Sequence, residues 1–163
     1  ALADAQTVDP LLDGLHVDPG PGELAPHRDV IRRCFSGLSV EDIVARLKSE
    51  RYDGKAFAEG ALADLERASP LSLKLTFRHI REAGATGLRL TLVRDYRLAT
   101  RCMKGGDFFE GVRARLVDRD NAPRWSPRQL RDVTDTLLED YFAPRSTGEL
   151  LLKTRQEMQA ARV

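Results

Sequence analysis

Apolar side chains recur at helical spacing through most of the chain after residue 27. The pattern predicts one short helix over residues 28–35 and another over residues 55–68. Between them, Ser39 is a plausible N-cap for a further helix. Glu41 and Asp42 occupy its first turn, where the helix dipole favours acidic side chains. Each of these helices is expected to bury one apolar stripe.

Residues 69–84 carry two conflicting signals. Their apolar positions alternate with polar ones, as in a strand: Leu71, Leu73, Leu75 and Phe77. Ser69 followed by Pro70, however, makes a good helix start, and Gly84 makes a good helix end. A lone strand would leave its backbone groups without hydrogen bonds, and the sequence offers no second strand to pair with it. We therefore predict a helix.

A longer helix is predicted from Thr86 to Lys104, where Gly105 and Gly106 end it. One of its faces is apolar and comprises Leu88, Leu92, Tyr96, Ala99 and Met103. Another face, within about 80° of arc, is basic and comprises Arg94, Arg97, Arg101 and Lys104. We expect the apolar face to be buried.

Two capping boxes predict the next helices. Asp107 with Glu110 would start one helix. Its buried side is predicted to consist of Phe108, Phe109, Val112 and Leu116. Ser126 with Gln129, separated by a proline at the first helical position, would start another helix that continues through Phe142.

The architecture predicted from these elements is all-α, with about seven short helices in 163 residues. Residues 1–27 hold four of the eight prolines and are interpreted as a connector. Residues 28–143 form the helical region. Residues 144–163 form a terminal helix or tail, with a weaker helix from Glu149 to Arg162.

Hydropathy and cysteine usage favour a protein that does not cross a membrane. No apolar run approaches 18 residues. Cys34 and Cys102 have no partner spacing, so they are interpreted as small apolar fillers in a reducing, cytoplasmic setting. The first residues, ALADAQ, lack a signal-peptide pattern and read like the tail of a helix that begins upstream. We expect the chain to be a piece of a longer product.

The charges are distributed unevenly along the chain. Residues 1–66 contain 13 acidic and 7 basic residues, a net charge of −6, whereas residues 74–131 contain 14 basic and 6 acidic residues, a net charge of +8. A basic middle with acidic flanks indicates an anionic ligand, an acidic partner surface, or a set of solvated helix faces.

Signatures of reaction chemistry are missing from the sequence. The three histidines are scattered, and neither cysteine is spaced from a histidine as metal ligands are. There is no phosphate-binding loop, no dinucleotide fingerprint and no GxSxG element. We expect no metal and no cofactor. Asp107 and Glu110 are interpreted as cap residues rather than as an acid/base pair.

The segment from Lys104 to Trp125, KGGDFFEGVRARLVDRDNAPRW, is nevertheless dense in charged and aromatic residues. Together with SPLSLKLTFRHI at residues 69–80 and the helix before it, this segment resembles the C-terminal region of the 3-hydroxyisobutyryl-CoA hydrolase branch of the crotonase (enoyl-CoA hydratase/isomerase) superfamily. The resemblance covers about residues 28–143. It rests on Tyr96-Arg97-Leu98, Cys102-Met103, Asp107-Phe108, Glu110-Gly111-Val112-Arg113-Ala114, and Asp118-Arg119-Asp120 before Pro123-x-Trp125.

The resemblance implies hydrolysis of an acyl-CoA thioester. In the family, the oxyanion hole and the catalytic acids belong to an N-terminal α/β spiral core. This sequence has neither the repeated β-turns nor the oxyanion glycines of that core, so no catalytic residue is assigned in it. The chain would be the helical region that packs over the core, covers the acyl-CoA pocket and makes subunit contacts, with a homo-oligomer as one option.

The resemblance also implies binding residues. Phe108 or Phe109 would contact the acyl group, and Arg119, with Arg124 in reserve, would meet the phosphates of coenzyme A. The expected partners are the acyl-CoA substrate and the missing core, not nucleic acid or a membrane. Two alternatives stay open: an enoyl-CoA hydratase or isomerase of the same superfamily, and a helical module that binds nucleic acid or an acidic protein through the basic face.

Overall fold

Side chains at the helix starts set several boundaries. The Oγ of Ser39 accepts a hydrogen bond from the amide three residues on, at 3.0 Å, and α3 (Val40–Ser49) follows. The Oγ of Ser69 does the same at 3.2 Å, and Pro70 takes the first position of α5 (Pro70–Ala83). Both predicted N-caps are confirmed, and residues 71–77 are helical despite their alternating pattern.

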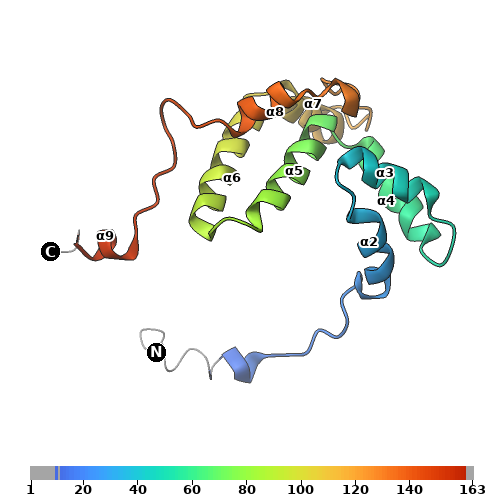
Figure 1. Cartoon of the computed structure of the whole chain (residues 1–163), viewed down its shortest axis with the longest axis horizontal. Helices are drawn as coiled ribbons and strands as arrows, with labels where there is room; N and C mark the ends of the chain where they lie inside the picture. Colours follow the sequence, from blue (N-terminus) through green and yellow to red (C-terminus); the bar gives the residue numbers. More distant parts are fainter. Residues whose placement is uncertain (1–9, 11, 161–163) are drawn as a thin grey trace.

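The structure, a computed structural model, describes residue 10 and residues 12–160. Within that part of the chain it contains helices and loops and no strand, as Figure 1 shows, so the predicted all-α class is confirmed. The ALADAQ segment lies outside the described residues. The other helical segments are η1 (Ala25–His27), α2 (Arg28–Phe35), α4 (Lys55–Arg67), α6 (Leu88–Cys102), α7 (Gly106–Val112), the π-helical turn η2 (Arg113–Val117), η3 (Leu130–Asp132), α8 (Asp135–Phe142) and α9 (Arg155–Ala160).

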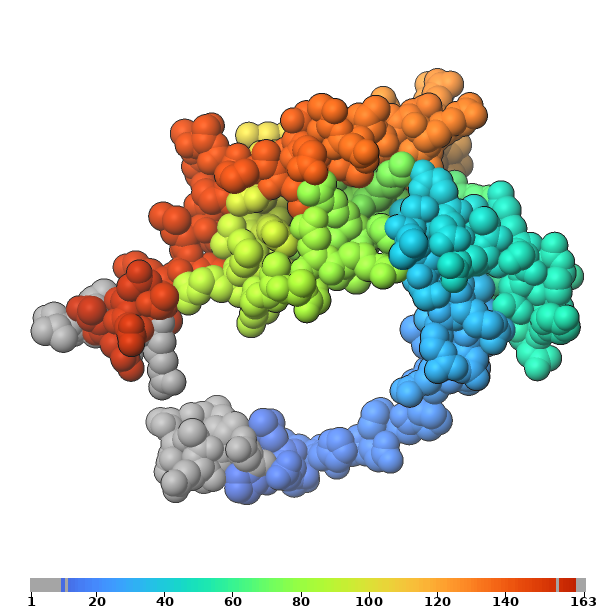
Figure 2. All heavy atoms as spheres, in the orientation of Figure 1, coloured from blue at the N-terminus to red at the C-terminus, as the bar shows by residue number. Residues whose placement is uncertain are grey.

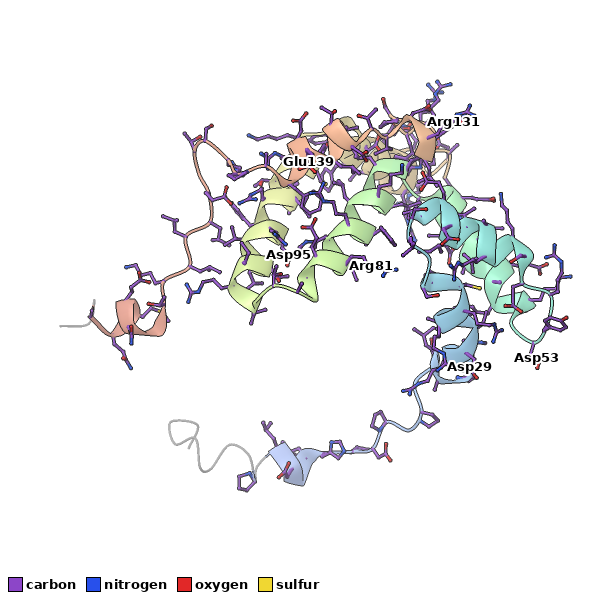
Figure 3. All side chains as sticks on the ribbon, viewed as in Figure 1. Asp29, Asp53, Arg81, Asp95, Arg131 and Glu139 are labelled. Atoms are coloured by element: carbon purple, nitrogen blue, oxygen red, sulfur yellow. The ribbon has the colours of Figure 1, made fainter. Side chains whose placement is uncertain are left out.

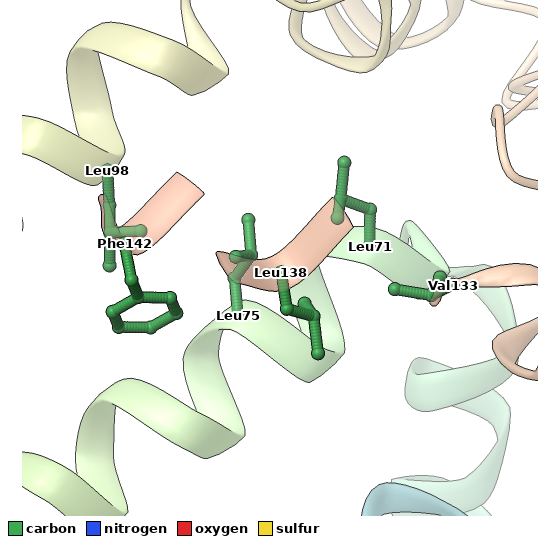
Figure 4. Close-up of a cluster of buried hydrophobic side chains, with 6 residues drawn as sticks. All are labelled: Leu71, Leu75, Leu98, Val133, Leu138 and Phe142. Carbon is green, nitrogen blue, oxygen red and sulfur yellow. The ribbon is translucent and has the colours of Figure 1, made fainter. Parts of the chain in front are cut away.

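Two apolar clusters hold the described helices together. Helices α2, α3 and α4 bury Val30, Cys34, Ile43, Leu47 and Ala58. Helices α5, α6 and α8, with the segment just before α8, bury Leu71, Leu75, Leu98, Val133, Leu138 and Phe142, which Figure 4 shows. Burial of such side chains is the main favourable contribution to folding.

Helix α5 joins the two clusters. Leu71 and Leu75 belong to the second cluster, whereas Phe77 packs against the first. The side chain of Lys74 is only 19% exposed, and its ammonium group lies 2.8 Å from the carboxylate of Glu41 in α3. Arg81, labelled in Figure 3, extends from α5 and donates a hydrogen bond to a backbone carbonyl just before α3.

Polar pairs also fix α8 and α6 against α5. The guanidinium of Arg78 lies 2.8 Å from Glu139 of α8. His79 of α5 and Asp95 of α6 are hydrogen-bonded at 2.6 Å. Figure 3 shows Glu139 and Asp95 on the two helices that flank α5. The three helices therefore form one packed unit.

The predicted capping box at Ser126 and Gln129 is wrong. Residues 126–129 are not helical, and the Ser126–Pro127 peptide is cis. The helix begins at Asp135 instead, where the Oγ1 of Thr134 accepts the capping hydrogen bond at 3.2 Å. The physical reason is a tertiary contact: the amide of Ser126 donates to a distant carboxylate, that of Asp107.

The two ends of the described chain lie apart from the packed helices. Residues 12–24 run away from α2 and leave an open space below α5, as Figures 1 and 2 show. The predicted helix from Glu149 to Arg162 is wrong over its first part, because residues 149–154 are not helical. Within the described part of that range, the helix comprises Arg155–Ala160. The Glu149 carboxylate instead accepts hydrogen bonds from Arg97 and from the backbone amide of Arg145.

Replacing Leu75 by alanine should lower the free energy of unfolding of residues 1–163 by about 2–4 kcal/mol, because it leaves a cavity in the second cluster. Urea denaturation followed by circular dichroism measures the change. Ile80→Ala on the same helix is the matched control, since Ile80 is 65% exposed. Equal losses for the two variants would contradict the assignment of Leu75 to the core.

Candidate functional site

The turn between α6 and α7 requires a close approach of the backbone to α8. A Cβ atom at Gly105 would lie 3.1 Å from the Oη of Tyr141 and 3.3 Å from the carbonyl oxygen of Cys102. Glycine therefore fits this position better than any residue with a side chain. The turn delivers α7 to the place where it meets the start of α5.

Asp107 ties α7 to two distant parts of the chain. Its Oδ2 accepts a hydrogen bond from the hydroxyl of Ser69 at 2.5 Å, and its Oδ1 accepts one from the amide of Ser126 at 2.8 Å. The predicted role of Asp107 as an N-cap is wrong, because Gly105 occupies that position. The carboxylate instead holds α5, α7 and the following loop together.

Glu110 is likewise not a capping residue. Its two oxygens accept hydrogen bonds from the guanidinium of Arg113 at 2.8 and 2.9 Å, and one of them also accepts the backbone amide of Arg124 at 2.7 Å. Arg113 and then the amide of Arg124 lower the pKa of Glu110 to about 2. Glu110 is therefore ionised at neutral pH and already engaged, so it is a poor candidate for a general acid or base.

Trp125 closes the other end of this segment. Its indole Nε1 donates to the carbonyl oxygen of Arg67, the last residue of α4, at 3.0 Å. A Cβ atom at Gly111 would lie 3.2 Å from the Trp125 ring, so the glycine allows the ring to lie against α7. Hydrogen bonds made by residues 107–125, which include most of α7, thus hold this segment against α4 and α5. These bonds explain why charged and aromatic residues are concentrated there.

A cleft of about 890 Å³ lies beside this segment, between the end of α4, the start of α5, α7 and η2. Its apolar lining includes Leu71, Cys102, Phe108, Val112, Leu116 and Tyr141. Arg67, Asp64 and Arg115 add charged groups to the lining. An apolar cleft with a few charged groups is a common form of ligand site.

The structure divides the predicted binding residues into two groups. Phe108 lines the cleft and is 45% exposed, with its ring edge-to-face against Phe109 at a centroid distance of 5.4 Å. Phe109, 62% exposed, is not part of the lining. Arg119 and Arg124 are exposed on the loop that follows η2, also outside the cleft lining. Phe108 is thus the one of the four that the cleft contains.

Sequence reasoning missed Arg67 and Arg115, the two basic residues of the cleft lining. They are 48 positions apart and come together only because the loop ending at Trp125 binds the end of α4. The charge surplus of residues 74–131 pointed to Arg115 only as one of many bases. Neither residue carried a spacing signal of its own.

The apolar face predicted for α6 is not buried by the described part of the chain. Leu88, Leu92, Tyr96 and Met103 are exposed, Leu88 at 75%. The residue that α6 buries in the second cluster is Leu98. At 3.6 residues per turn, the predicted stripe is centred about 120° around the helix from Leu98. The expectation that this stripe is covered is wrong for the chain as described.

Of the four side chains on the predicted buried side of α7, Val112 is half-buried and the other three are exposed. Phe108, Phe109 and Leu116 all keep large apolar areas in solvent. We group these residues with the α6 stripe under the name bare face, defined by their exposure and comprising Leu88, Leu92, Tyr96, Met103, Phe108, Phe109 and Leu116. Apolar side chains left bare in such numbers are typical of an interface.

The predicted basic face of α6 is largely used inside the protein. Arg97 donates to the carbonyl oxygen of Phe142 at 2.6 Å, and Arg101 donates to that of Tyr141 at 3.0 Å. Arg94 lies 3.1 Å from the carboxylate of Glu82. Three of the four bases of this face therefore already bind α8 and α5, which disfavours the interpretation of the face as a free nucleic-acid-binding surface; Lys104 is exposed.

The remaining reactive side chains are poorly placed for catalysis. Burial raises the pKa of the Cys102 thiol, and the nearby Asp107 raises it further, which disfavours the reactive thiolate. Burial also raises the pKa of Cys34.

Across the described ranges, no three His, Cys, Asp or Glu side chains gather as a metal site would require. No helix in those ranges has the length and apolar composition to cross a membrane.

Known proteins resemble this chain in sequence. A family model for enoyl-CoA hydratase/isomerase matches residues 1–142. A Xenopus tropicalis protein named 3-hydroxyisobutyryl-CoA hydrolase, mitochondrial, is 43% identical over 132 residues, which are 81% of this chain and 34% of that protein. A Rattus norvegicus protein of the same name is 38% identical over 90% of this chain and 38% of its own length. The chain therefore spans about a third of the length of these relatives.

Solved structures resemble it as well. A carnitinyl-CoA dehydratase from Mycobacterium thermoresistibile superposes with a TM-score of 0.74 at 36% identity, over 85% of this chain and 39% of that one. An enoyl-CoA hydratase from Rhodobacter sphaeroides 2.4.1 superposes with a TM-score of 0.69 at 31% identity, over 88% of this chain and 43% of that one. Both likenesses cover most of this chain and less than half of the other protein.

The low pKa of Glu110 makes its ion pair with Arg113 sensitive to acid in a defined pH range. The folded-state pKa, about 2, lies below the ordinary value of 4.5, so the ion pair with Arg113 stabilises the fold above pH 4.5 and is lost as pH falls towards 2. Carbon-13 NMR of the Glu110 carboxyl group should give a midpoint near 2. In Arg113→Gln the midpoint should rise towards 4.5, and an unchanged midpoint would contradict the pairing.

Proposed function

The chain belongs to the enoyl-CoA hydratase/isomerase family, and we propose that it is the C-terminal part of an acyl-CoA thioester hydrolase that acts on 3-hydroxyisobutyryl-CoA. The names of the relatives at about 40% identity support the hydrolase. Their length supports a larger enzyme, because this chain spans 34% of the Xenopus tropicalis protein. A cytoplasmic location stays a prediction, and the relatives carry the word mitochondrial in their names.

The observation that carries this proposal is the bare face. A self-contained helical domain would turn the stripe of α6 and the phenylalanines of α7 inwards, because leaving them in water costs about 25 cal/mol for each Å² of apolar surface. Here α6 buries Leu98 instead and presents that stripe outwards. The α/β spiral core implied by the family is the occupant that we assign to this face.

Phe108 supplies the connection to the substrate. Its ring lines the cleft and is also half exposed at the bare face, so a core docked there would close the cleft on one side. In this arrangement Phe108, with Phe109 beside it, contacts the acyl group. Arg119, with Arg124 in reserve, binds the phosphates of coenzyme A from the loop outside the cleft. Subunit contacts in a homo-oligomer would use apolar surface that the core leaves bare.

The chemistry itself belongs to the core. Thioester hydrolysis needs backbone N–H donors that point at the developing oxyanion, and a carboxylate that acts as base or nucleophile. Of the two carboxylates in the cleft lining, Asp107 accepts hydrogen bonds from Ser69 and from the amide of Ser126, and Asp64 pairs with Arg67. Glu110, outside the lining, is held by Arg113 and by the amide of Arg124. The helical region therefore shapes the substrate pocket and leaves the reaction to residues of the core.

A second candidate function is supported by the solved structures. They are a carnitinyl-CoA dehydratase and an enoyl-CoA hydratase, names that indicate a reaction on the acyl chain rather than on the thioester. Free CoA release and hydration of a double bond are separable by assay. The full-length protein that contains this chain should release free CoA from 3-hydroxyisobutyryl-CoA, and hydration of an enoyl-CoA without CoA release would favour the second candidate.

Purified residues 1–163 should release no CoA above the buffer rate, whereas the full-length protein should be active, because the oxyanion donors lie in the core. A thiol-reactive dye that reports free CoA measures both proteins under the same conditions. Sequencing upstream of Ala1 provides the control, since it should show the spiral core. Turnover by residues 1–163 alone would contradict the proposal.

In the full-length protein, Phe108→Ala should lower kcat/KM for 3-hydroxyisobutyryl-CoA about tenfold or more, since a buried aromatic contact contributes about 1.5–3 kcal/mol. Steady-state kinetics of CoA release measures this loss. Tyr52→Ala is the control, because Tyr52 is an exposed aromatic residue in the loop before α4. Equal kinetics for Phe108→Ala and the wild-type protein would remove Phe108 from the pocket.

A further inference from the structure

The guanidinium of Arg113 uses every hydrogen-bond donor it has. An arginine side chain carries five N–H groups in a fixed planar arrangement. Three carboxylates and one backbone carbonyl accept five hydrogen bonds from Arg113, those of Glu110, Asp118, Asp120 and Ala122. The side chain is only 31% exposed. No N–H donor of Arg113 is left for a ligand. Arg113 can therefore act on a ligand only by positioning the residues that it binds.

We call Arg113, with the groups of Glu110, Asp118, Asp120 and Ala122 that it binds, the Arg113 hub. This hub explains an unusual backbone in the loop around Arg119. Arg119 and Asn121 have φ angles of 56° and 51°, in the left-handed region that residues other than glycine seldom adopt. These two residues flank Asp120, and the resulting turn brings Asp118 and Asp120 back to the same guanidinium. Such a conformation costs free energy and persists when neighbouring contacts enforce it. The side chain of Arg119, between the two bound carboxylates, is left exposed.

The same hub anchors Arg124. Glu110, held by Arg113 through both oxygens, accepts the backbone amide of Arg124 at 2.7 Å. The carbonyl of Ala122, two residues earlier, accepts a hydrogen bond from Arg113 itself. The turn η2 contributes from the other side, where the amide of Asp118 donates to the carbonyl of Arg113 at 2.8 Å. Residues 118–124 are therefore fixed to Arg113 directly at Asp118 and, at Arg124, through the Glu110 carboxylate that Arg113 holds.

We infer that Arg113 is a positioning residue for coenzyme A: it shapes the loop of residues 118–124 so that the exposed side chains of Arg119 and Arg124 meet the nucleotide phosphates. This inference rests on the proposed function for the identity of the ligand. It goes further in naming a residue that never touches the substrate and in assigning a purpose to Asp118 and Asp120. These two carboxylates, although negative, promote the binding of an anion.

Positioning and simple charge balance predict opposite effects when an acidic residue near the loop is removed. If the acidic residues near the loop acted only through their charge, removing one would strengthen binding of a phosphate. If they act by holding the loop, removing one frees residues that must then be ordered on binding. Asp120 is the sharpest choice, because it accepts hydrogen bonds both from Arg113 and from the amide of Ala122.

The test measures the affinity of the full-length protein for coenzyme A and for pantetheine, which lacks the nucleotide phosphates, by titration calorimetry. We expect Asp120→Ala to weaken coenzyme A binding about tenfold, the cost of ordering roughly one residue, and to leave pantetheine binding unchanged. Asp29→Ala is the matched control, because Asp29 is an exposed, salt-bridged acid on α2. Tighter binding of coenzyme A, or an equal change for both ligands, would overturn the inference.

Arg113→Lys provides a second, independent test. Lysine keeps the positive charge but has three donors on a single nitrogen and cannot reproduce the planar arrangement. We expect it to weaken coenzyme A binding as much as Arg113→Gln does, with pantetheine binding again unchanged. Full rescue by lysine would show that charge alone matters. Free CoA release by the wild-type protein is measured separately, so failure of the proposed hydrolase reaction is distinguishable from failure of the positioning role.

Discussion

Helix α6 has apolar side chains on two sides, Leu98 and Cys102 on one and the stripe from Leu88 to Met103 on the other, and the hydrogen bonds that fix its rotation allow only one side to be buried within the described chain. Arg97 and Arg101 donate to the carbonyl groups at the end of α8, which holds the Leu98 side of the helix against α5 and α8. The stripe from Leu88 to Met103 must then face outwards. A helix whose arginines are bound in this way cannot rotate to cover its own apolar surface.

The segment that follows α6 forms one wall of the cleft. Asp107 and Trp125 fasten α7 and its loop to α5 and α4, so Phe108 belongs both to the cleft lining and to the bare face. Arg113 then gives the loop its shape. The charged residues of this segment therefore serve mainly as internal hydrogen-bond partners. A pocket wall that leaves catalysis to another part of the enzyme needs this rigidity more than it needs reactive groups.

Sequence reasoning identified the helices whose boundaries are set locally. Ser39, Ser69 and Gly84 act through neighbouring backbone groups, and a one-dimensional pattern contains that information. It failed where a distant partner competes: Ser126 resembled an N-cap, but its amide is bound by Asp107, and Glu110 is bound to Arg113 and Arg124. The family resemblance directed attention to Phe108. The Arg113 hub could not be read from the sequence, because it requires the left-handed turn at residues 119–121, which no turn-forming glycine announces.

The central claim, that the bare face is covered by the core of a larger enzyme, can be tested by hydroxyl-radical footprinting. Oxidation of Leu92, Tyr96 and Met103 is compared between purified residues 1–163 and the full-length protein, with the exposed Tyr52 as an internal reference. The account predicts rapid oxidation of all three stripe residues in the isolated chain and strong protection of them, but not of Tyr52, in the full-length protein. Equal oxidation in the two proteins would contradict it.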